Sequence, residues 1–288
     1  MLGPAWNGTY RFQHGLTSPV NFSSVGSREL HMSYRVDVHK MGQCQVRGPE
    51  VFWMDRWDDW EDLFFYMVLV RGKGKMAVIN TGPPADLSAL NARWTAGFGE
   101  RGALVRREDE SVEMALGRMD VTAGEVDLVL ITPLQAYAVG NIPLFHNAKV
   151  CISRRGWIED FHAPTYEMHV PRQLRIPDDV LSYLTLEAPE RLHLLEDEEK
   201  ILPGLSAFWV GTHHRSSMAY LIETDEGRVA VTDCCFKYAN IEQLHPLGIM
   251  ESLPECMAAY RRIQREADVV IPLYDPEVLK RFPDGKVA

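Results

Sequence analysis

The sequence is short of cysteine and of long apolar runs. Only five of its 288 residues are cysteine, and no two are spaced as Cys-x-x-Cys. An odd, scattered set of this kind favours buried thiols in a reducing compartment over a disulfide framework. The longest apolar stretches, such as residues 64–70, fall far below the roughly 20 residues that a membrane helix needs. Residues 1–15 lack a basic start followed by an apolar run, so we expect a soluble, cytoplasmic protein with no membrane partner.

Basic charge is also scarce, with 30 lysines and arginines against 40 aspartates and glutamates and a formal net charge of −10. A nucleic-acid binder needs a basic surface, so we expect no nucleic-acid partner. Several motifs are missing as well: the chain has no P-loop, no glycine-rich dinucleotide fingerprint after a strand, no Gly-x-Ser-x-Gly and no His-Glu-x-x-His. What remains is an ordinary globular composition, 46% hydrophobic and 24% charged.

The hydrophobic pattern predicts an N-terminal arm at residues 1–34 and one domain at 35–288. The arm is rich in Ser, Gly and Asn and has little periodicity. Within the domain, a segment at about 158–185 contains three prolines and resembles a lid. Strands are predicted at 33–42, 63–70, 76–79, 126–132, 148–153, 192–196, 205–212, 217–224, 228–233 and 268–273, and helices within 85–120 and at 254–267. Strands gathered in two halves, with helices between and after them, indicate a layered α/β architecture with two mixed sheets.

Short polar pieces follow several of these strands. They lie at 80–82, 132–141, 211–218, 232–233 and 272–276. Loops at the carboxyl ends of strands in an α/β sandwich converge on one edge, so we expect the functional site where these pieces meet.

In this order, the chain from about residue 34 to its end resembles the metallo-β-lactamase fold superfamily, and within it the lactonase-type hydrolases. The matching stretches are FFYMVLVRGKGKMAVINTG, EVDLVLITPLQAYAVGNIPLFHNAKVCISRRGW, FWVGTHHRSSMAYLIETDEGRVAVTDCCF and DVVIPLYDPEVLKRFPDG. The resemblance implies a four-layer αββα sandwich with its active site along one edge of the two sheets.

The metal-ligand pattern of that superfamily is largely replaced here. Its members carry His-x-His-x-Asp-His after the buried strand, where this sequence has Pro-Leu-Gln-Ala-Tyr-Ala at 133–138. The next ligand matches His213, with His214 as the other choice. The bridging carboxylate matches Asp233, and the final histidine is replaced by Tyr274. His213 and Asp233 alone are fewer than the roughly three protein ligands of a catalytic zinc. We therefore expect no metal cofactor; one Zn or Fe ion on this pair is the less favoured alternative.

Tyr137 and Tyr274 leave two interpretations open if the superfamily's geometry holds. With His213 and Asp233 they form a ligand set suited to ferric iron, but ionising two phenols near neutral pH requires a strongly acidic metal. In the interpretation that we favour, the two rings fill the vacated metal cavity. Asn80 stands where the superfamily usually has Asp, which fits a lost metal requirement.

The resemblance assigns candidate roles to nine residues. Candidate catalytic residues are His213, Asp233, Tyr137 and Tyr274, and candidate substrate-binding residues are Gln135, His214, Trp57, Arg154 and His146. Trp57 belongs to a stretch in which tryptophans alternate with carboxylates, a composition that favours either an interface or a pocket wall. Arg154 starts the lid and could contact a substrate carboxylate; a solvated helix face is the alternative.

Two functions follow from the resemblance. The first is a small-molecule binder, or a non-catalytic subunit beside an active relative, that has lost the dinuclear metal site. The second is a hydrolase of lactones or cyclic amides that uses an altered mononuclear or metal-independent site. In either case we expect a small-molecule ligand and a homo-oligomer or a heteromer with a related subunit, with the arm and the tryptophan-rich stretch as its interface.

Overall fold

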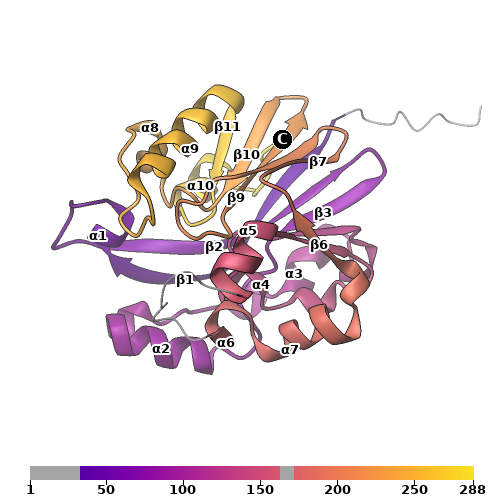
Figure 1. The fold of residues 1–288 in the computed structure, drawn as a ribbon, viewed down its shortest axis with the longest axis horizontal. Coiled ribbons are helices and arrows are strands. Elements are labelled where there is room, and N and C mark those ends of the chain that lie inside the picture. The colour runs from indigo at the N-terminus through magenta and orange to yellow at the C-terminus, as the bar shows by residue number, and fades with distance from the viewer. Residues whose placement is uncertain (1–32, 163–171) are drawn as a thin grey trace, which may run out of the picture. The chain divides into compact units, whose positions relative to one another are not determined.

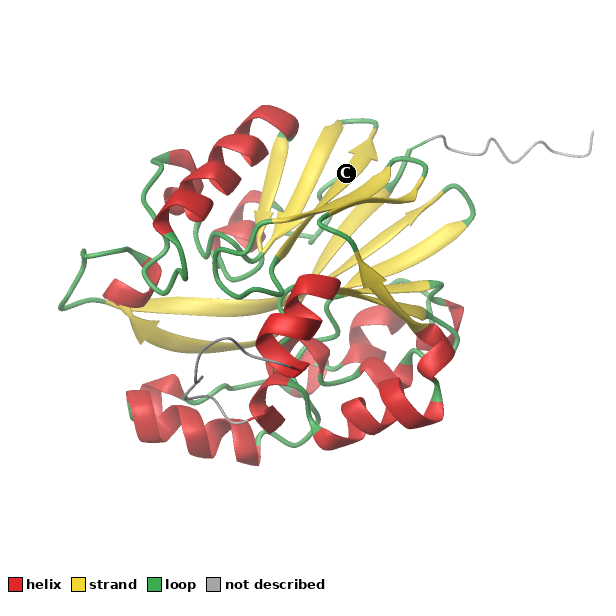
Figure 2. Cartoon of the chain, in the orientation of Figure 1, coloured by secondary structure: helices red, strands yellow, loops and turns green. Residues whose placement is uncertain are grey.

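The computed structural model describes residues 33–162 and 172–288, which form two β-sheets packed face to face with helices on their outer sides (Figure 1). The arm predicted at 1–34 lies outside the described residues except for its last two. The lid predicted at about 158–185 is described on either side of residues 163–171. The two-sheet layering expected from the strand pattern is present (Figure 2).

The first sheet follows the chain order β1-β2-β3-β4-β5-β6. Its strands are β1 (Arg35–Arg47), β2 (Trp60–Gly72), β3 (Lys75–Ile79), β4 (Leu128–Leu130), β5 (Lys149–Ser153) and β6 (Leu192–Leu195). The first three are antiparallel and the rest are parallel. Lys73 and Gly74 join β2 to β3 with φ of 53° and 72°. Two left-handed residues between paired strands match the right-handed sheet twist, which explains the predicted hairpin.

The second sheet has the order β11-β10-β9-β8-β7. Its strands are β7 (Glu198–Leu202), β8 (Leu205–Trp209), β9 (Met218–Thr224), β10 (Gly227–Thr232) and β11 (Val269–Pro272). β7 is absent from the sequence prediction, because its residues Glu-Glu-Lys-Ile-Leu are largely polar and no side chain among them is fully buried. It lies at the edge of the sheet, where a strand needs only one pairing partner.

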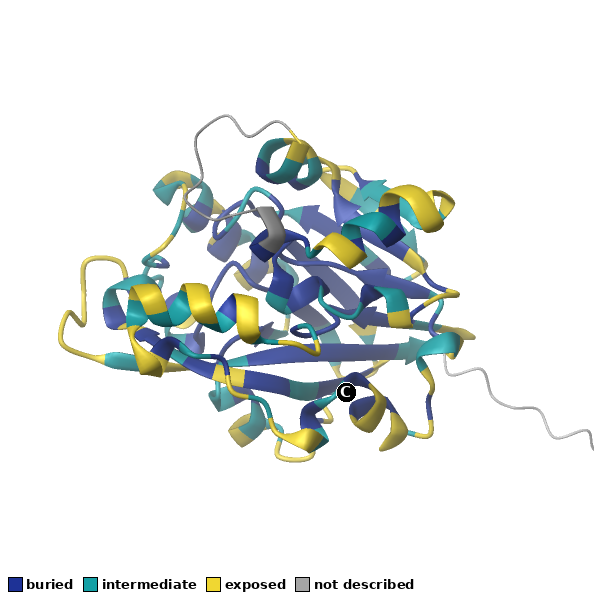
Figure 3. Cartoon of the chain, turned by 90° about the horizontal axis from the view of Figure 1, so that it is seen from below, coloured by how far each residue is buried: buried dark blue, intermediate teal, exposed yellow. Residues whose placement is uncertain are grey.

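Helices cover the outer faces of both sheets, with their exposed residues turned outward (Figure 3). The helices on the first sheet's side are α2 (Ser88–Phe98), α3 (Val112–Gly117), α4 (Ala136–Val139), α5 (Arg154–Gly156), α6 (Arg172–Arg175) and α7 (Asp178–Ser182). Those beside the second sheet are α8 (Tyr238–Glu242), α9 (Leu253–Glu266) and α10 (Glu277–Arg281). Helix α1 (Gly48–Val51) lies between β1 and β2 in the chain. Helix α9 buries Cys256, Ala259, Tyr260 and Ile263, one apolar stripe at helical spacing.

The core is divided between these layers. One apolar cluster joins residues of both sheets with α9, and another joins the first sheet to α3 and α7. All five cysteines are buried and free, as the scattered cysteine pattern predicts. Among the described residues, no helix combines the length and the apolar character that a bilayer crossing requires.

Candidate functional site

Asp233 is the centre of a buried polar network where the strands of the two sheets end. It directly follows β10 and is 0% exposed. Its Oδ1 accepts a hydrogen bond from Thr132 Oγ1, and its Oδ2 accepts one of 2.6 Å from Ser217 Oγ. His213 Nδ1 lies 3.1 Å from the same Oδ2. Protein donors therefore hold both carboxylate oxygens, as a buried charge requires.

Asn80 positions Thr132 for this contact. The Asn80 side-chain amide donates to the Thr132 carbonyl at 2.7 Å, and the Thr132 backbone N–H donates to Asn80 Oδ1 at 2.9 Å. Asn80 has a φ of 60°, a left-handed conformation in which asparagine is several-fold enriched. An ionised aspartate has no N–H for the Thr132 carbonyl, so the neutral amide is the side chain that fits both contacts.

His213 presents one ring edge to Asp233 and the other to a cavity. Because a carboxylate only accepts hydrogen bonds, Nδ1 is the donor in this pair, and Nε2 lies on the opposite edge of the ring, toward the cavity. Phe236 packs edge-on against the imidazole with ring centroids 4.7 Å apart. A buried His–Asp pair of this form can accept a proton from a bound molecule.

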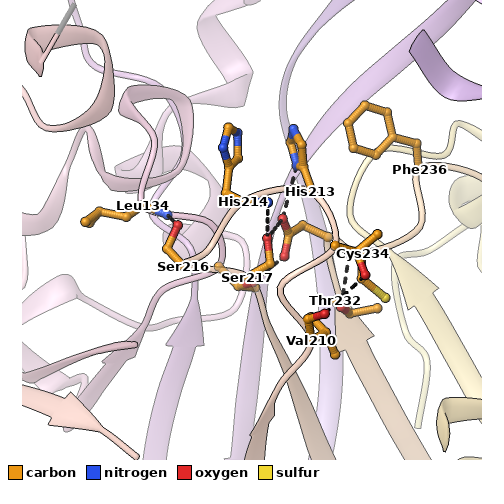
Figure 4. Close-up of polar contacts among 12 residues, drawn as sticks. Leu134, Val210, His213, His214, Ser216, Ser217, Thr232, Cys234 and Phe236 are labelled. Atoms are coloured by element: carbon orange, nitrogen blue, oxygen red, sulfur yellow. Dashed lines mark hydrogen bonds and ion pairs between the residues drawn. The ribbon is translucent and has the colours of Figure 1, made fainter. Parts of the chain in front are cut away.

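His214 faces the same cavity without bonding to Asp233. The two imidazoles extend in the same direction from their loop, with centroids 4.1 Å apart (Figure 4). Burial, together with the neighbouring His213, holds the pKa of His214 well below its usual value, so this ring is neutral. Its Nδ1 makes no hydrogen bond within the described part of the chain. Of the two histidines that the sequence left as alternatives, His213 contacts the carboxylate, and both line the cavity.

Tyr137 and Tyr274 stand beside this pair in a cluster of aromatic rings. Their centroids are 6.1 Å apart, and Tyr274 lies 4.6 Å from Phe236. Phe65 contacts both tyrosines, at 5.1 and 5.6 Å. Burial raises the pKa of both phenols well above the ordinary value, and the charge of Asp233 adds to the effect. Both are therefore neutral phenols.

The cavity has a volume of about 280 Å³ and lies in front of the histidines. Its wall is mainly apolar and aromatic, with Phe65, Leu90, Trp94, Phe98, Tyr137, Leu174, Phe236, Ile249 and Tyr274. Polar groups are few, and two of them have no hydrogen-bond partner among the described residues: the side-chain nitrogen of Gln135 and Nδ1 of His214. The Tyr274 hydroxyl interacts with the hydroxyl of Tyr137. An apolar pocket with a few unsatisfied polar groups is the usual form of a small-molecule site.

Ion pairs and a hydrogen bond connect the loop that carries the histidines to the segment after α5 and to α9. Arg215 forms ion pairs with Glu159 at 2.8 Å and with Glu255 at 2.7 Å. Asp160 Oδ2 accepts the Ser216 backbone N–H at 2.8 Å. Gly156 permits this approach, because a Cβ there would lie 2.2 Å from Ser216 Cα. The start of the predicted lid therefore supports the site from outside.

Comparison with solved structures places this arrangement in a known fold. An N-acyl homoserine lactone hydrolase, solved with the product N-hexanoyl-L-homoserine at its catalytic metal center, is similar with a TM-score of 0.70 and 15% identity, over 88% of this chain and 99% of that one. A probable metal-dependent hydrolase from Staphylococcus aureus is similar with a TM-score of 0.64 and 16% identity, over 80% of this chain and 84% of that one. AbOPH, a hydrolase of the beta lactamase superfamily, is similar with a TM-score of 0.56 and 13% identity, over 80% of this chain and 82% of that one. The chain has the metallo-β-lactamase fold.

The fold predicted from the sequence is thereby confirmed. No protein-family model and no curated protein matches the sequence. At identities of 13–16% the likeness concerns the fold. What this metallo-β-lactamase fold does has to be argued from its own site.

The donor set of this site does not fit the metal centre that the fold implies. Within residues 33–162 and 172–288, no three His, Cys, Asp or Glu side chains are grouped as metal ligands. The Asp233 oxygens are occupied by protein donors, and His213 Nδ1 is committed to the same carboxylate. Gln135 offers a neutral amide, and burial raises the pKa of the Tyr137 and Tyr274 phenols well above the ordinary value, which makes them poor anionic ligands. The remaining donors are too few and too weak for two cations.

Three sequence-predicted site residues lie outside the cavity wall. Trp57 is 62% exposed on the loop before β2. Arg154 on α5 forms a 2.8 Å ion pair with Glu196, and His146 is exposed beside the Leu144 carbonyl. The other six, namely His213, Asp233, Tyr137, Tyr274, Gln135 and His214, are gathered at the strand ends, and all but Asp233 line the cavity.

Sequence reasoning missed several wall residues. Trp94 on α2 and Phe65 on β2 stand within a helix and a strand, and their only sequence signal was apolar spacing. Glu50 on α1 lines the cavity as well. Burial raises its pKa to about 6, against an ordinary 4.5. Glu50 could have been identified as a wall residue, because it is a carboxylate next to the predicted tryptophan-rich stretch.

Proposed function

We propose that this protein binds a small, uncharged and mostly apolar molecule in the cavity at the sheet edge, either alone or as a non-catalytic subunit beside an active relative. The observation that carries the proposal is the combination of an aromatic wall with the unpaired polar atoms of Gln135 and His214. Apolar burial supplies the affinity, and a carbonyl-type acceptor on the ligand satisfies the Gln135 N–H group.

N-Hexanoyl-L-homoserine lactone is a suitable first probe, because the similar hydrolase holds N-hexanoyl-L-homoserine. It is uncharged and has an apolar chain and carbonyl acceptors. Trp94 lies in the cavity wall, so quenching of tryptophan fluorescence measures binding. Saturable quenching supports the proposal, and unchanged emission up to millimolar probe contradicts it for this class of ligand.

Two glycines provide a matched pair of variants. Gly97 on α2 lines the cavity, and a Cβ there meets no atom within 4 Å. Gly117 on α3 is equally open and lies away from the cavity. Each Gly→Leu change gains up to about 1 kcal/mol of helix propensity. Gly97→Leu places a side chain at the cavity and is expected to weaken probe binding at least tenfold, whereas Gly117→Leu leaves it unchanged.

The His213–Asp233 pair favours a second candidate, a metal-independent reaction at the same edge. Nε2 of His213 faces the cavity and its partner carboxylate is buried, which is the arrangement of a general base. In a lactone hydrolysis, Nε2 would take a proton from the water whose oxygen bonds to the carbonyl carbon, while Asp233 stabilises the imidazolium. The imidazolium would then return this proton to the ring oxygen as the C–O bond breaks and the hydroxy acid forms. The phenol of Tyr274, which stays protonated, would donate toward the carbonyl oxygen.

To test this candidate, metal ions are first removed from the protein by exhaustive chelation. Opening of the lactone is then measured by chromatography. Turnover that survives chelation and disappears in His213→Gln supports it. Turnover equal in wild type and His213→Gln excludes it, while probe binding without turnover leaves the binder as the function.

A further inference from the structure

The loop at residues 53–59, which we name the tryptophan loop, exposes three large apolar side chains. Trp53 is 43%, Met54 66% and Trp57 62% exposed. The loop projects between α1 and β2 at the left of Figure 1. Single exposed apolar residues are normal on a protein surface, but three within five positions form a patch, and such patches mark interaction sites.

The loop holds this patch in one backbone conformation. Its ends close through a 3.0 Å hydrogen bond from Gly48 N to the Asp59 carbonyl, and a Cβ at Gly48 would lie 2.2 Å from the Arg56 carbonyl oxygen. Trp53 N donates to the Pro246 carbonyl at 3.0 Å. The Arg56 guanidinium covers the buried Phe52 ring at 3.7 Å. Little conformational entropy remains to be lost when a partner binds.

Two residues of the loop have unfavourable backbone conformations. Met54 and Arg56 have φ of 57° and 54°, in the left-handed region that non-glycine residues rarely adopt. Local strain of this kind persists where surrounding contacts enforce it, and it is concentrated at functional positions. Here it accompanies the outward display of Met54 and Trp57.

The charge around the patch is negative. Asp55, Asp58 and Asp59 are exposed and have no ion pair within the described residues. Arg56, the one cation of the loop, is paired with Glu61 at 2.7 Å. A second copy docked face to face would bring the same aspartates together, and an anionic membrane would repel them. The complementary partner carries apolar side chains flanked by lysine or arginine.

We propose that the tryptophan loop docks a basic amphipathic segment of another protein. Trp53 and Trp57 supply the apolar anchors, and the aspartates supply the charge complement. Aromatic anchors of this type dominate the binding energy of protein interfaces. The docked segment lies beside the cavity mouth, because Ile249 and Glu50 both line the cavity and are joined by a 3.0 Å backbone hydrogen bond at the base of the loop.

A fluorescein-labelled amphipathic peptide of leucine and lysine is the probe, with the same peptide carrying glutamate for lysine as its counterpart. Fluorescence anisotropy with the full chain is expected to show saturable binding of the lysine peptide only. The double variant Trp53→Ala/Trp57→Ala should bind at least tenfold more weakly. Asp58→Asn/Asp59→Asn should weaken binding at low salt and flatten its salt dependence.

Two control variants carry the same changes elsewhere on the surface. Leu186→Ala removes a side chain that is 78% exposed, and Asp178→Asn/Asp179→Asn removes two charges from α7. Both should bind the lysine peptide as wild type does. The proposal is overturned if these controls lose affinity as much as the loop variants, or if the loop variants bind normally. Equal binding of the glutamate peptide, or tryptophan-dependent binding to phosphatidylcholine vesicles in place of the peptide, also overturns it. The circular dichroism spectrum of each variant verifies its folding.

Discussion

The Ser217 hydroxyl links the backbone of His214 to the side chain of Asp233. It accepts the His214 N–H at 3.0 Å and donates to Asp233 Oδ2 at 2.6 Å. Ser217→Ala removes both contacts inside the core. We expect the free energy of unfolding to fall by about 2 kcal/mol, measured by urea denaturation. Ser182→Ala, which removes a surface hydroxyl bonded to Glu187, should cost less than about 0.5 kcal/mol. Equal losses in the two variants would contradict the buried network.

Tyr274→Phe should change stability little but weaken ligand binding. The Tyr274 hydroxyl is buried and interacts with the hydroxyl of Tyr137, so its removal is expected to change the free energy of unfolding by less than about 1 kcal/mol. The same change removes a donor from the cavity and should weaken binding of an acyl lactone several-fold. Thermal unfolding and fluorescence titration measure the two effects. A Tyr274→Phe protein that is several kcal/mol less stable would contradict this expectation.

Glu50 makes stability depend on pH. Burial raises its pKa to about 6 in the folded state, against an ordinary 4.5, so the folded state favours the protonated carboxyl. Stability should therefore fall as the pH rises from about 4.5 through about 6. The shift corresponds to about 2 kcal/mol, which partial exposure reduces to the order of 1 kcal/mol.

Glu50→Gln removes this dependence. The variant should match wild type below pH 4.5 and exceed it in stability above pH 6. Glu113→Gln, an exposed change on α3, is the control and should follow wild type at every pH. Denaturation midpoints between pH 4 and 8 test the sign, and a Glu50→Gln protein less stable than wild type at pH 7.5 would refute it.

Arg215 lies near the surface beside the site, and we expect its side chain to contribute strongly to the stability of the folded protein. It is 15% exposed, pairs with Glu159 and Glu255, and stacks over Trp209 at 4.4 Å. Arg215→Ala leaves these carboxylates without their cation, and we expect a loss of about 2 kcal/mol. Arg228→Ala breaks an exposed pair and should cost less than about 1 kcal/mol. Hydrogen exchange at residues 157–162 should increase in the first variant only.

Metal removal should leave the protein unchanged. Because the carboxylate oxygens of Asp233 are held by protein donors, chelation with EDTA is expected to shift the melting temperature by less than about 1 °C, and zinc should not raise it. Elemental analysis of the purified protein gives the number of metal ions bound per chain. Stoichiometric zinc or iron whose removal lowers the melting temperature would contradict the account of the site.

Most strands could be predicted because their signal is local. The runs in β2, β4 and β9 are apolar on both faces, so their burial can be predicted from the amino-acid sequence alone. β7 could not be found, because an exposed edge strand has no such run. Short helices such as α8 and α10 have only five residues each, too few for a helical period to emerge.

The candidate site was predictable only in part. Its place at the strand ends and its unusual ligand positions follow from residue types at known points of the chain. The sequence could not choose between a pocket residue and a solvated helix face for Arg154, because its ion-pair partner, Glu196, lies 42 residues away in the sequence. Trp57 could be a pocket wall or an interface on composition alone, and its exposure depends on how the loop folds back on residues 245–249.

The sequence by itself determined the layered α/β fold and the residue types that stand at the candidate site, because periodicity and residue chemistry are properties of single segments. The tertiary structure alone decided that His213 and not His214 contacts Asp233, that Asn80 holds Thr132, and that aromatic rings enclose a cavity. These relationships join loops from different strands, and their geometry exists only after both sheets have packed.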